Sequence, residues 1–120
     1  MKTMGAHIID RKKWRVEFRV YAFNRKDVGL LLNHGGGKTE LLPMEKEEPH
    51  IFRTETEGLR NIDYKFRLGN DGDFPDPFSH YQPDGVDGFS RVIDHEHYTW
   101  KNPGWQGKEL AELIFYELHV

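Results

Sequence analysis

The clearest pattern along the chain is a strict alternation of apolar and polar residues over residues 14–23. The apolar phase consists of Trp14, Val16, Phe18, Val20 and Ala22, and the other phase of Arg15, Glu17, Arg19, Tyr21 and Phe23. Successive side chains of a β-strand point to opposite faces, so this alternation predicts a strand that buries its apolar phase. Residues 62–68 alternate in the same way and predict a second strand of this kind.

Further short strands are expected at residues 5–9, 28–33, 39–44 and 50–56, where apolar or β-branched residues are bounded by turn-forming residues. The run at 28–33 (VGLLLN) has no polar alternation, which indicates burial on both faces. Polar or Gly- and Pro-containing segments at 24–27, 34–38, 45–49 and 58–61 are predicted to be turns. Many short strands with closely spaced turns favour an all-β fold, an antiparallel β-sandwich over residues 1–70.

The composition changes after residue 70, because four of the six prolines lie beyond it. Residues 76–94 (DPFSHYQPDGVDGFSRVID) hold too many proline and glycine breakers for a helix. The same stretch is too apolar for a plain linker, and residues 92–93 are able to pair as a short strand. We therefore interpret residues 71–107 as an irregular strap that packs on the sandwich and on a second body.

Residues 108–120 form a third segment, the expected start of a second domain. Residues 108–112 predict one helical turn, and 113–120 (LIFYELHV) form an apolar run typical of a buried strand in a parallel sheet. Each parallel neighbour of such a strand needs a crossover of about a dozen residues, and the sequence stops at Val120. We expect residues 114–120 to be poorly ordered or to pair with an intermolecular edge.

Length, charge and composition narrow the class of partner. The 120 residues contain no cysteine and carry a net charge of −3, which argues against a thiolate metal site and against a nucleic-acid partner. No apolar run approaches the ~20 residues that cross a bilayer, and the first residues lack the apolar core of a signal peptide. We expect a cytoplasmic chain that binds neither nucleic acid nor membrane.

Motifs for catalysis and metal binding are incomplete. The GGGKT run at residues 35–39 lacks the first glycine of a phosphate loop. The acidic residues near Pro75 do not fit a calcium loop, and His95 and His97 have no third zinc ligand at a recognisable spacing. No pair of carboxylates is marked out by its context. We predict no catalytic residue, no metal and no cofactor in this chain.

Aromatic residues on polar strand phases are the best candidates for a binding site. Tyr21 and Phe23 lie on the outward phase of residues 14–23, beside Arg19. A planar ring offers apolar contact to a sugar ring, and a neighbouring arginine donates to hydroxyls. Two interpretations stay open, since these rings either bind a sugar or pack under the later segment. The same choice applies to Trp100 and Trp105, which a breaker-rich segment also needs as anchors.

These motifs, taken in order, resemble the N-terminal part of the maltooligosyltrehalose trehalohydrolases, which are α-amylase-family glycoside hydrolases. The resemblance rests on FRVYA, on residues 76–94, on YTWKNPGWQG and on IFYELHV. The sequence departs from the family pattern at Tyr21-Ala22-Phe23, where Trp-Ala-Pro is usual, around residues 61–63, where a glycine is usual, and at Asp87-Gly88, where His-Gly is usual. These departures weaken the assignment to one subfamily and leave the resemblance to the enzyme group intact.

The resemblance implies an immunoglobulin-like sandwich of the glycogen-binding-module type, with Tyr21 as the first candidate for contact with an α-glucan. It also implies that residues 116–120 begin the first strand of a (β/α)8 barrel that holds the catalytic carboxylates. The expected function is that of a non-catalytic domain of an enzyme that releases trehalose from maltooligosyltrehalose. Two alternatives remain, a stand-alone binding module for α-glucan or maltooligosaccharide and a docking module of a branching or debranching enzyme. The expected partners are that glucan and the barrel of the same polypeptide.

Overall fold

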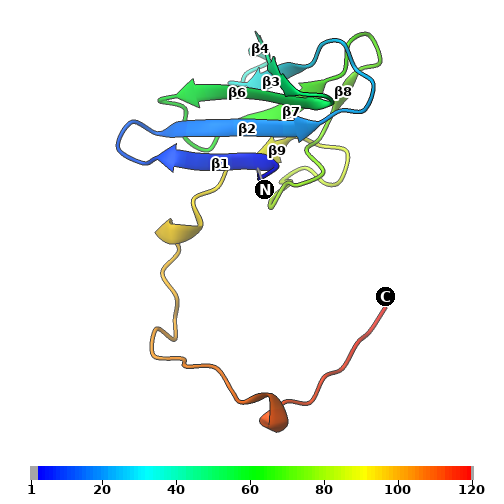
Figure 1. The fold of residues 1–120 in the computed structure, drawn as a ribbon. Helices are drawn as coiled ribbons and strands as arrows, with labels where there is room; N and C mark the ends of the chain where they lie inside the picture. The colour runs from blue at the N-terminus through cyan, green and yellow to red at the C-terminus, as the bar shows by residue number, and fades with distance from the viewer. Residues whose placement is uncertain (1–2, 120) are drawn as a thin grey trace.

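The computed structural model describes residues 3–119, which form two antiparallel sheets packed face to face and a long C-terminal tail (Figure 1). The predicted all-β antiparallel sandwich is confirmed. None of the helices within residues 3–119 has the length and apolar character needed to cross a membrane.

The first sheet contains four strands in the order β1-β2-β6-β5. Their bounds are Gly5–Asp10 for β1, Arg15–Tyr21 for β2, Glu45–Glu48 for β5 and Ile51–Glu57 for β6. The central pair β2 and β6 is in continuous antiparallel register from Arg15 opposite Glu57 to Tyr21 opposite Ile51. The alternation of residues 14–23 thus forms the middle of this sheet.

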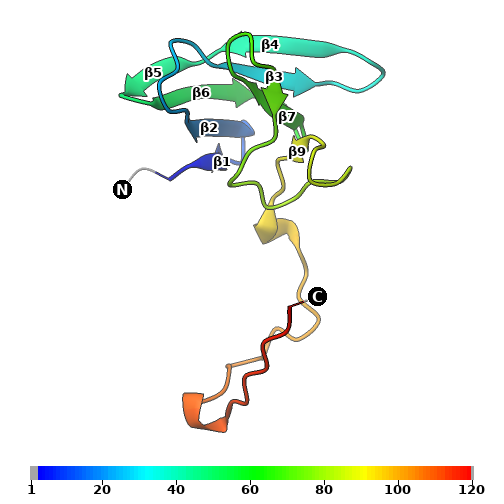
Figure 2. The same cartoon turned by 90° about the vertical axis from the view of Figure 1, so that its right-hand side faces the viewer.

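The second sheet has the order β4-β3-β7-β8, with β9 also paired to β7. Its strands are β3 (Gly29–Asn33), β4 (Thr39–Pro43), β7 (Asp63–Arg67), β8 (Asp73–Phe74) and β9 (Ser90–Arg91). The two short strands share one edge of β7, since β9 pairs with its first half and β8 with its last. Figure 2 shows both sheets from a direction at right angles to that of Figure 1.

Strand β5 differs from the sequence prediction, which made residues 45–49 a turn. All four residues of β5 are exposed, and its backbone pairs with β6 at the edge of the first sheet. A strand with no buried side chain leaves no hydrophobic period to detect. Charged side chains also suit an exposed edge, because they discourage pairing with other chains.

The sandwich continues beyond residue 70, where the sequence analysis had ended it, because β8 and β9 belong to the second sheet. The expected short strand at residues 92–93 lies two residues earlier, at β9. Val92 follows that strand, donates its N–H to the Ile62 carbonyl at 3.1 Å and is buried in the core. The first part of the strap is therefore held to β7 at two places, through β8 and through β9.

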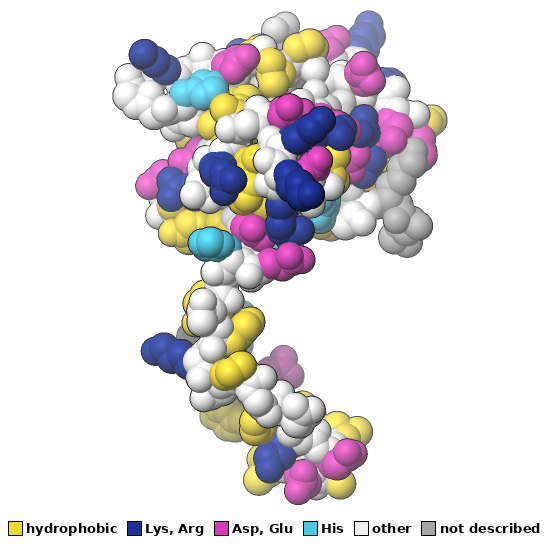
Figure 3. All heavy atoms as spheres, turned by 90° about the vertical axis from the view of Figure 1, so that its left-hand side faces the viewer, with side chains coloured by type: hydrophobic (Ala, Val, Ile, Leu, Met, Phe, Trp, Pro, Cys, Tyr) yellow, Lys and Arg dark blue, Asp and Glu magenta, His cyan; other side chains and the backbone are white. Residues whose placement is uncertain are grey.

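After Val92 the chain leaves the sandwich through η1 (His95–His97) and runs as a tail to η2 (Leu110–Glu112) and beyond (Figure 1). The helical turn expected at 108–112 is present as η2. Residues 113–119 form no strand, and Ile114 is 97% exposed. Figure 3 shows hydrophobic side chains gathered along this tail. The predicted strand is thus missing over 113–119, since no described segment supplies a neighbour, and Val120 lies outside the described residues.

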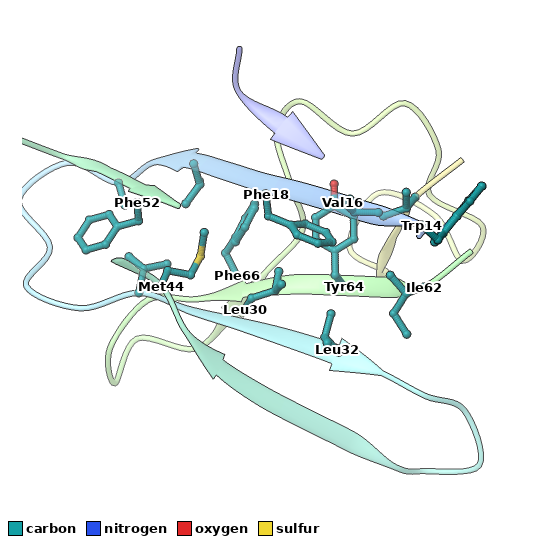
Figure 4. Packing of buried hydrophobic residues seen from close by; sticks show 14 residues of the cluster. Trp14, Val16, Phe18, Leu30, Leu32, Met44, Phe52, Ile62, Tyr64 and Phe66 are labelled. Carbon is teal, nitrogen blue, oxygen red and sulfur yellow. The ribbon is translucent and has the colours of Figure 1, made fainter. Parts of the chain in front are cut away.

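The core lies between the two sheets, and the apolar phase of residues 14–23 supplies a large part of it (Figure 4). All five predicted inward residues are buried, with Val16 and Phe18 fully so. Phe18 of β2 meets Tyr64 of β7 edge to face at 4.9 Å between ring centroids, which joins the two sheets. The core is completed by β3, where Leu30, Leu31 and Leu32 are buried, as predicted for a strand covered on both faces.

Candidate functional site

Two exposed rings and one half-buried ring lie together at the end of β2, next to the turn between β5 and β6. We call this group, Tyr21, Phe23 and His50, the aromatic shelf. Tyr21 is 53% exposed and Phe23 is 69% exposed, whereas Ala22 between them is buried. The strand alternation explains the arrangement, because a buried Ala22 turns both neighbouring side chains outward.

The backbone fixes this corner of the sandwich through His50. The Ala22 N–H donates to the His50 carbonyl at 2.6 Å, and the Asn24 N–H donates to His50 Nδ1 at 3.0 Å. Asn24 and His50 both have positive φ, at 54° and 70°. Asparagine and histidine are among the residues that most often adopt this conformation. Two tight turns from different parts of the sequence are thus tied together.

The rings of the shelf are tilted against each other. The Tyr21 and His50 centroids are 5.8 Å apart with an interplanar angle of 67°. The Phe23 and His50 centroids are 4.8 Å apart at 42°. Two exposed rings and the half-buried imidazole between them form an uneven apolar surface with polar edges, which suits a ligand that has both apolar faces and hydroxyl groups.

The interpretation in which Tyr21 and Phe23 pack under the later segment is wrong, because both side chains are more than half exposed. The tail lies at the far end of β2, since Arg11 in the β1–β2 turn is hydrogen-bonded to Asp94 at 3.3 Å. Tyr21 is ~20 Å from the first residue of this strand at about 3.3 Å per residue.

Arg19 does not join the shelf, although the sequence analysis placed it beside Tyr21 as a sugar contact. Its side chain donates to Glu17 at 2.6 Å and to Glu47 at 2.9 Å, and the residue is only 7% exposed. It belongs to an ion-pair ladder on the outer face of the first sheet, made of Arg15, Glu17, Arg19, Glu47, Arg53 and Glu55. The Arg19 donors are already occupied, so this geometry offers a sugar little from Arg19.

The two tryptophans named as candidates lie on the tail, which runs away from the sandwich in Figure 1. Trp100 is 72% exposed and Trp105 is 66% exposed. Tyr98 meets Trp100 edge to face at 5.0 Å, and these rings line a shallow surface on the tail. Within residues 3–119 neither tryptophan is buried against the sandwich.

A second hollow lies between β1 and the strap, with a volume of about 240 Å³. His80 and His95 meet there, with Nδ1 and Nε2 2.8 Å apart. Below it Asp76 is buried and accepts from the Tyr64 hydroxyl at 2.6 Å. Burial raises the pKa of the Asp76 carboxyl, and the Tyr64 and Phe78 donors lower it in part. These contacts hold the strap, and within residues 3–119 no cluster of three or more metal-ligating side chains was found.

His50 is the shelf residue that the sequence analysis missed, because it was read as the first residue of a strand. The available signal was Pro49 before it, since a proline-containing polar segment favours a turn. Its contacts to Ala22 and Asn24 join positions far apart in the sequence, and no local pattern predicts such contacts.

Comparison with known proteins agrees with this architecture. Residues 3–85 match the family described as Carbohydrate-binding module 48 (Isoamylase N-terminal domain). The malto-oligosyltrehalose trehalohydrolase of Arthrobacter ramosus is 34% identical over 106 residues, which cover 86% of this chain and 18% of that protein. The enzyme of the same name from Saccharolobus solfataricus is 32% identical over 107 residues, which cover 88% and 18%. An alpha-amylase family enzyme from Salmonella typhimurium has a TM-score of 0.75 and 34% identity, over 91% of this chain and 18% of that chain.

The chain spans 18% of the length of both curated relatives. The resemblance stated from the sequence motifs is confirmed by these two trehalohydrolases and by the solved structure. The family match covers well over half of the 120 residues and contains the shelf and both sheets except β9. The chain therefore belongs to the carbohydrate-binding module 48 family.

Proposed function

We propose that this chain is a non-catalytic domain of an α-glucan-acting glycoside hydrolase, and that the intact enzyme releases trehalose from maltooligosyltrehalose. The observation that carries this proposal is the tail. Val92 is the last residue along the chain that is buried in the core of the sandwich. The tail that follows it carries exposed apolar side chains, among them Leu110, Ile114, Phe115, Tyr116 and Leu118. Soluble chains rarely expose a contiguous apolar segment of this kind unless it meets a partner.

The tail supports a catalytic barrel as that partner. The likeness to the Salmonella typhimurium enzyme covers 91% of this chain, which is more than the sandwich alone. The trehalohydrolase relatives are several times longer than this chain. The division into a sandwich, a strap and the start of a barrel near residue 108 belongs to this proposal, as does the cytoplasmic location.

The test uses the purified chain and the proposed barrel, expressed separately. We expect the two to associate, and we expect Phe115→Asp to weaken association at least tenfold by calorimetry because a charge would enter an apolar contact. Lys101→Asp, which also changes a charge on the exposed tail, is the matched control. The chain alone should release no trehalose from maltooligosyltrehalose. Trehalose release by the chain, or equal association of Phe115→Asp and wild type, would refute the proposal.

We further propose that the shelf binds α-glucan or maltooligosaccharide, which is the second function that a specific observation favours. Tyr21 and Phe23 are exposed at a position that the tail does not cover. Apolar contact of sugar rings with these rings requires no ion pair, so binding should be weak and nearly independent of salt.

Titration with maltoheptaose followed by NMR tests this function. Tyr21→Ala should raise the Kd about tenfold, the equivalent of about 1.4 kcal/mol, whereas Trp105→Ala on the tail should leave it unchanged. Cellohexaose, a flat β-linked chain, should bind more weakly to the tilted rings. If millimolar maltoheptaose shifts no shelf resonance of the wild type, the shelf is not a glucan site.

A further inference from the structure

His50 occupies a constrained position in the shelf. Its φ of 70° places it in the left-handed region, which few non-glycine residues adopt. Its carbonyl accepts from the Ala22 N–H, and its ring lies within 6 Å of both exposed rings of the shelf. The imidazole is thus held at a fixed place between Tyr21 and Phe23.

The hydrogen-bond partner of His50 assigns its tautomer. The backbone N–H of Asn24 is a donor only, and it points at Nδ1 from 3.0 Å. Nδ1 must then act as the acceptor, so the neutral ring carries its proton on Nε2. Among residues 3–119, His50 Nε2 has no hydrogen-bond partner.

We propose that His50 is a specificity-determining contact of the shelf, whose Nε2–H donates to a hydroxyl of the glucose ring stacked on Tyr21 or Phe23. This inference rests on the proposed glucan binding by the shelf. The two aromatic rings supply apolar contact, which depends on the shape of the sugar chain and not on where its hydroxyl groups point. A fixed donor between them selects ligands that place a hydroxyl against it, because a mispaired polar group costs binding free energy.

Histidine at this position supplies an acceptor for the Asn24 N–H and a donor for the ligand, and two variants separate these roles. His50→Asn keeps an acceptor near the place of Nδ1 and tolerates positive φ, but it removes the Nε2 donor. His50→Gln places an amide donor near the position of Nε2 but loses the acceptor for the Asn24 N–H. A purely structural histidine predicts that Asn preserves binding and Gln weakens it, whereas a sugar-contacting histidine predicts the reverse order of affinities.

The experiment measures maltoheptaose binding by NMR for wild type, Tyr21→Ala, His50→Asn and His50→Gln, with thermal unfolding of each. We expect His50→Asn to unfold near the wild-type temperature and to bind about fivefold more weakly, as for one neutral hydrogen bond. We expect His50→Gln to unfold at a lower temperature and to bind more tightly than His50→Asn.

Nitrogen NMR of the wild-type imidazole provides an independent readout. It should show the Nε2-protonated tautomer, and the Nε2–H resonance should shift on addition of maltoheptaose. If His50→Asn binds maltoheptaose as tightly as wild type, or if the wild-type ring is protonated on Nδ1, the proposed role of His50 is wrong and the shelf remains a glucan site. Absence of wild-type binding overturns the glucan site itself and this inference with it.

Discussion

Replacing Tyr64 with phenylalanine removes one buried hydroxyl and keeps the aromatic ring. That hydroxyl donates to Asp76 Oδ2 at 2.6 Å, and both residues are at most 3% exposed. Asp76 also accepts from the Phe78 N–H through Oδ1 and donates its own N–H to Ser90 Oγ. The Tyr64 bond therefore ties the start of the strap to β7, inside the sandwich.

The expected cost follows from the charge of the acceptor. A hydrogen bond to a charged group contributes about 1.5–3 kcal/mol, so Tyr64→Phe should lower the free energy of unfolding by about 2 kcal/mol at neutral pH. The edge contacts of the ring with Phe18 and Phe66 remain, so cavity formation adds little. For a domain of this size the melting temperature should fall by roughly 8–16 °C.

The cost should depend on pH in a defined direction. Burial raises the pKa of Asp76, and the Tyr64 hydroxyl is one of the donors that lower it. A carboxyl with a raised folded pKa stabilises the protein below its unfolded pKa, and this contribution is lost as the pH rises through the folded value. Removing the hydroxyl raises the pKa of Asp76 further. The difference in free energy of unfolding between wild type and Tyr64→Phe should therefore be largest near pH 7 and smallest below about pH 4.

Urea unfolding followed by circular dichroism at pH 7 and pH 3.5 measures both quantities. Tyr98→Phe is the matched control, because Tyr98 is 58% exposed on the tail and should change stability by less than about 0.5 kcal/mol. A Tyr64→Phe variant as stable as wild type, or one with the same loss at both pH values, would refute this account of Asp76.

Three further predictions concern the core, the ladder and the tail. Leu30→Ala, at a fully buried position, should cost about 3 kcal/mol in urea unfolding, and a loss below about 1 kcal/mol would show that the core collapses around the missing atoms. Arg15 hydrogen-bonds Glu55 and lowers its pKa, so Glu55 stabilises the fold above its unfolded pKa and loses this effect as the pH falls through the lower folded value. Glu55→Gln should therefore be less stable than wild type at pH 7 but not at pH 3 in thermal unfolding, and an equal difference at both would contradict it. Amides of residues 114–119 should exchange with deuterium at nearly the rate of an unfolded chain, because the described structure gives them no backbone partner, and protection in the purified chain would reveal pairing of the tail.

The strands with one buried face were predictable from local pattern alone. The apolar phase of residues 14–23 identified every inward side chain of β2, because alternation is a property of a single extended chain. The uninterrupted apolar run of β3 likewise indicated burial on both faces. In each case the side chains themselves carry the signal.

Strands without a hydrophobic period were missed or misplaced. All side chains of β5 are exposed, and the two residues of β9 are too short a segment for any period. Their backbone groups are satisfied by β6 and β7, which lie elsewhere in the sequence. Such strands exist because a partner edge is available, and local sequence carries no record of that edge.

The candidate site was also predictable only in part. Tyr21 and Phe23 were identified from their phase on the strand, but the sequence left open whether a later segment covered them. The structure decided this, because both side chains are more than half exposed and the Asp94 contact with Arg11 places the tail at the opposite end of β2. Arg19 is likewise excluded from the site, because its side chain donates to Glu47 in the ion-pair ladder. Glu47 belongs to β5, the edge strand that the sequence analysis did not predict.

The sequence by itself therefore determined the sandwich class, the inward face of its central strands, the family resemblance and the apolar nature of the tail. These depend on the order of residue types along one strand or on motifs read directly from the chain. The tertiary structure alone decided which outward residues are exposed, and it brought His50 between Tyr21 and Phe23. The physical reason is that these contacts join segments distant in sequence, and they form only when both sheets have fixed where their turns meet.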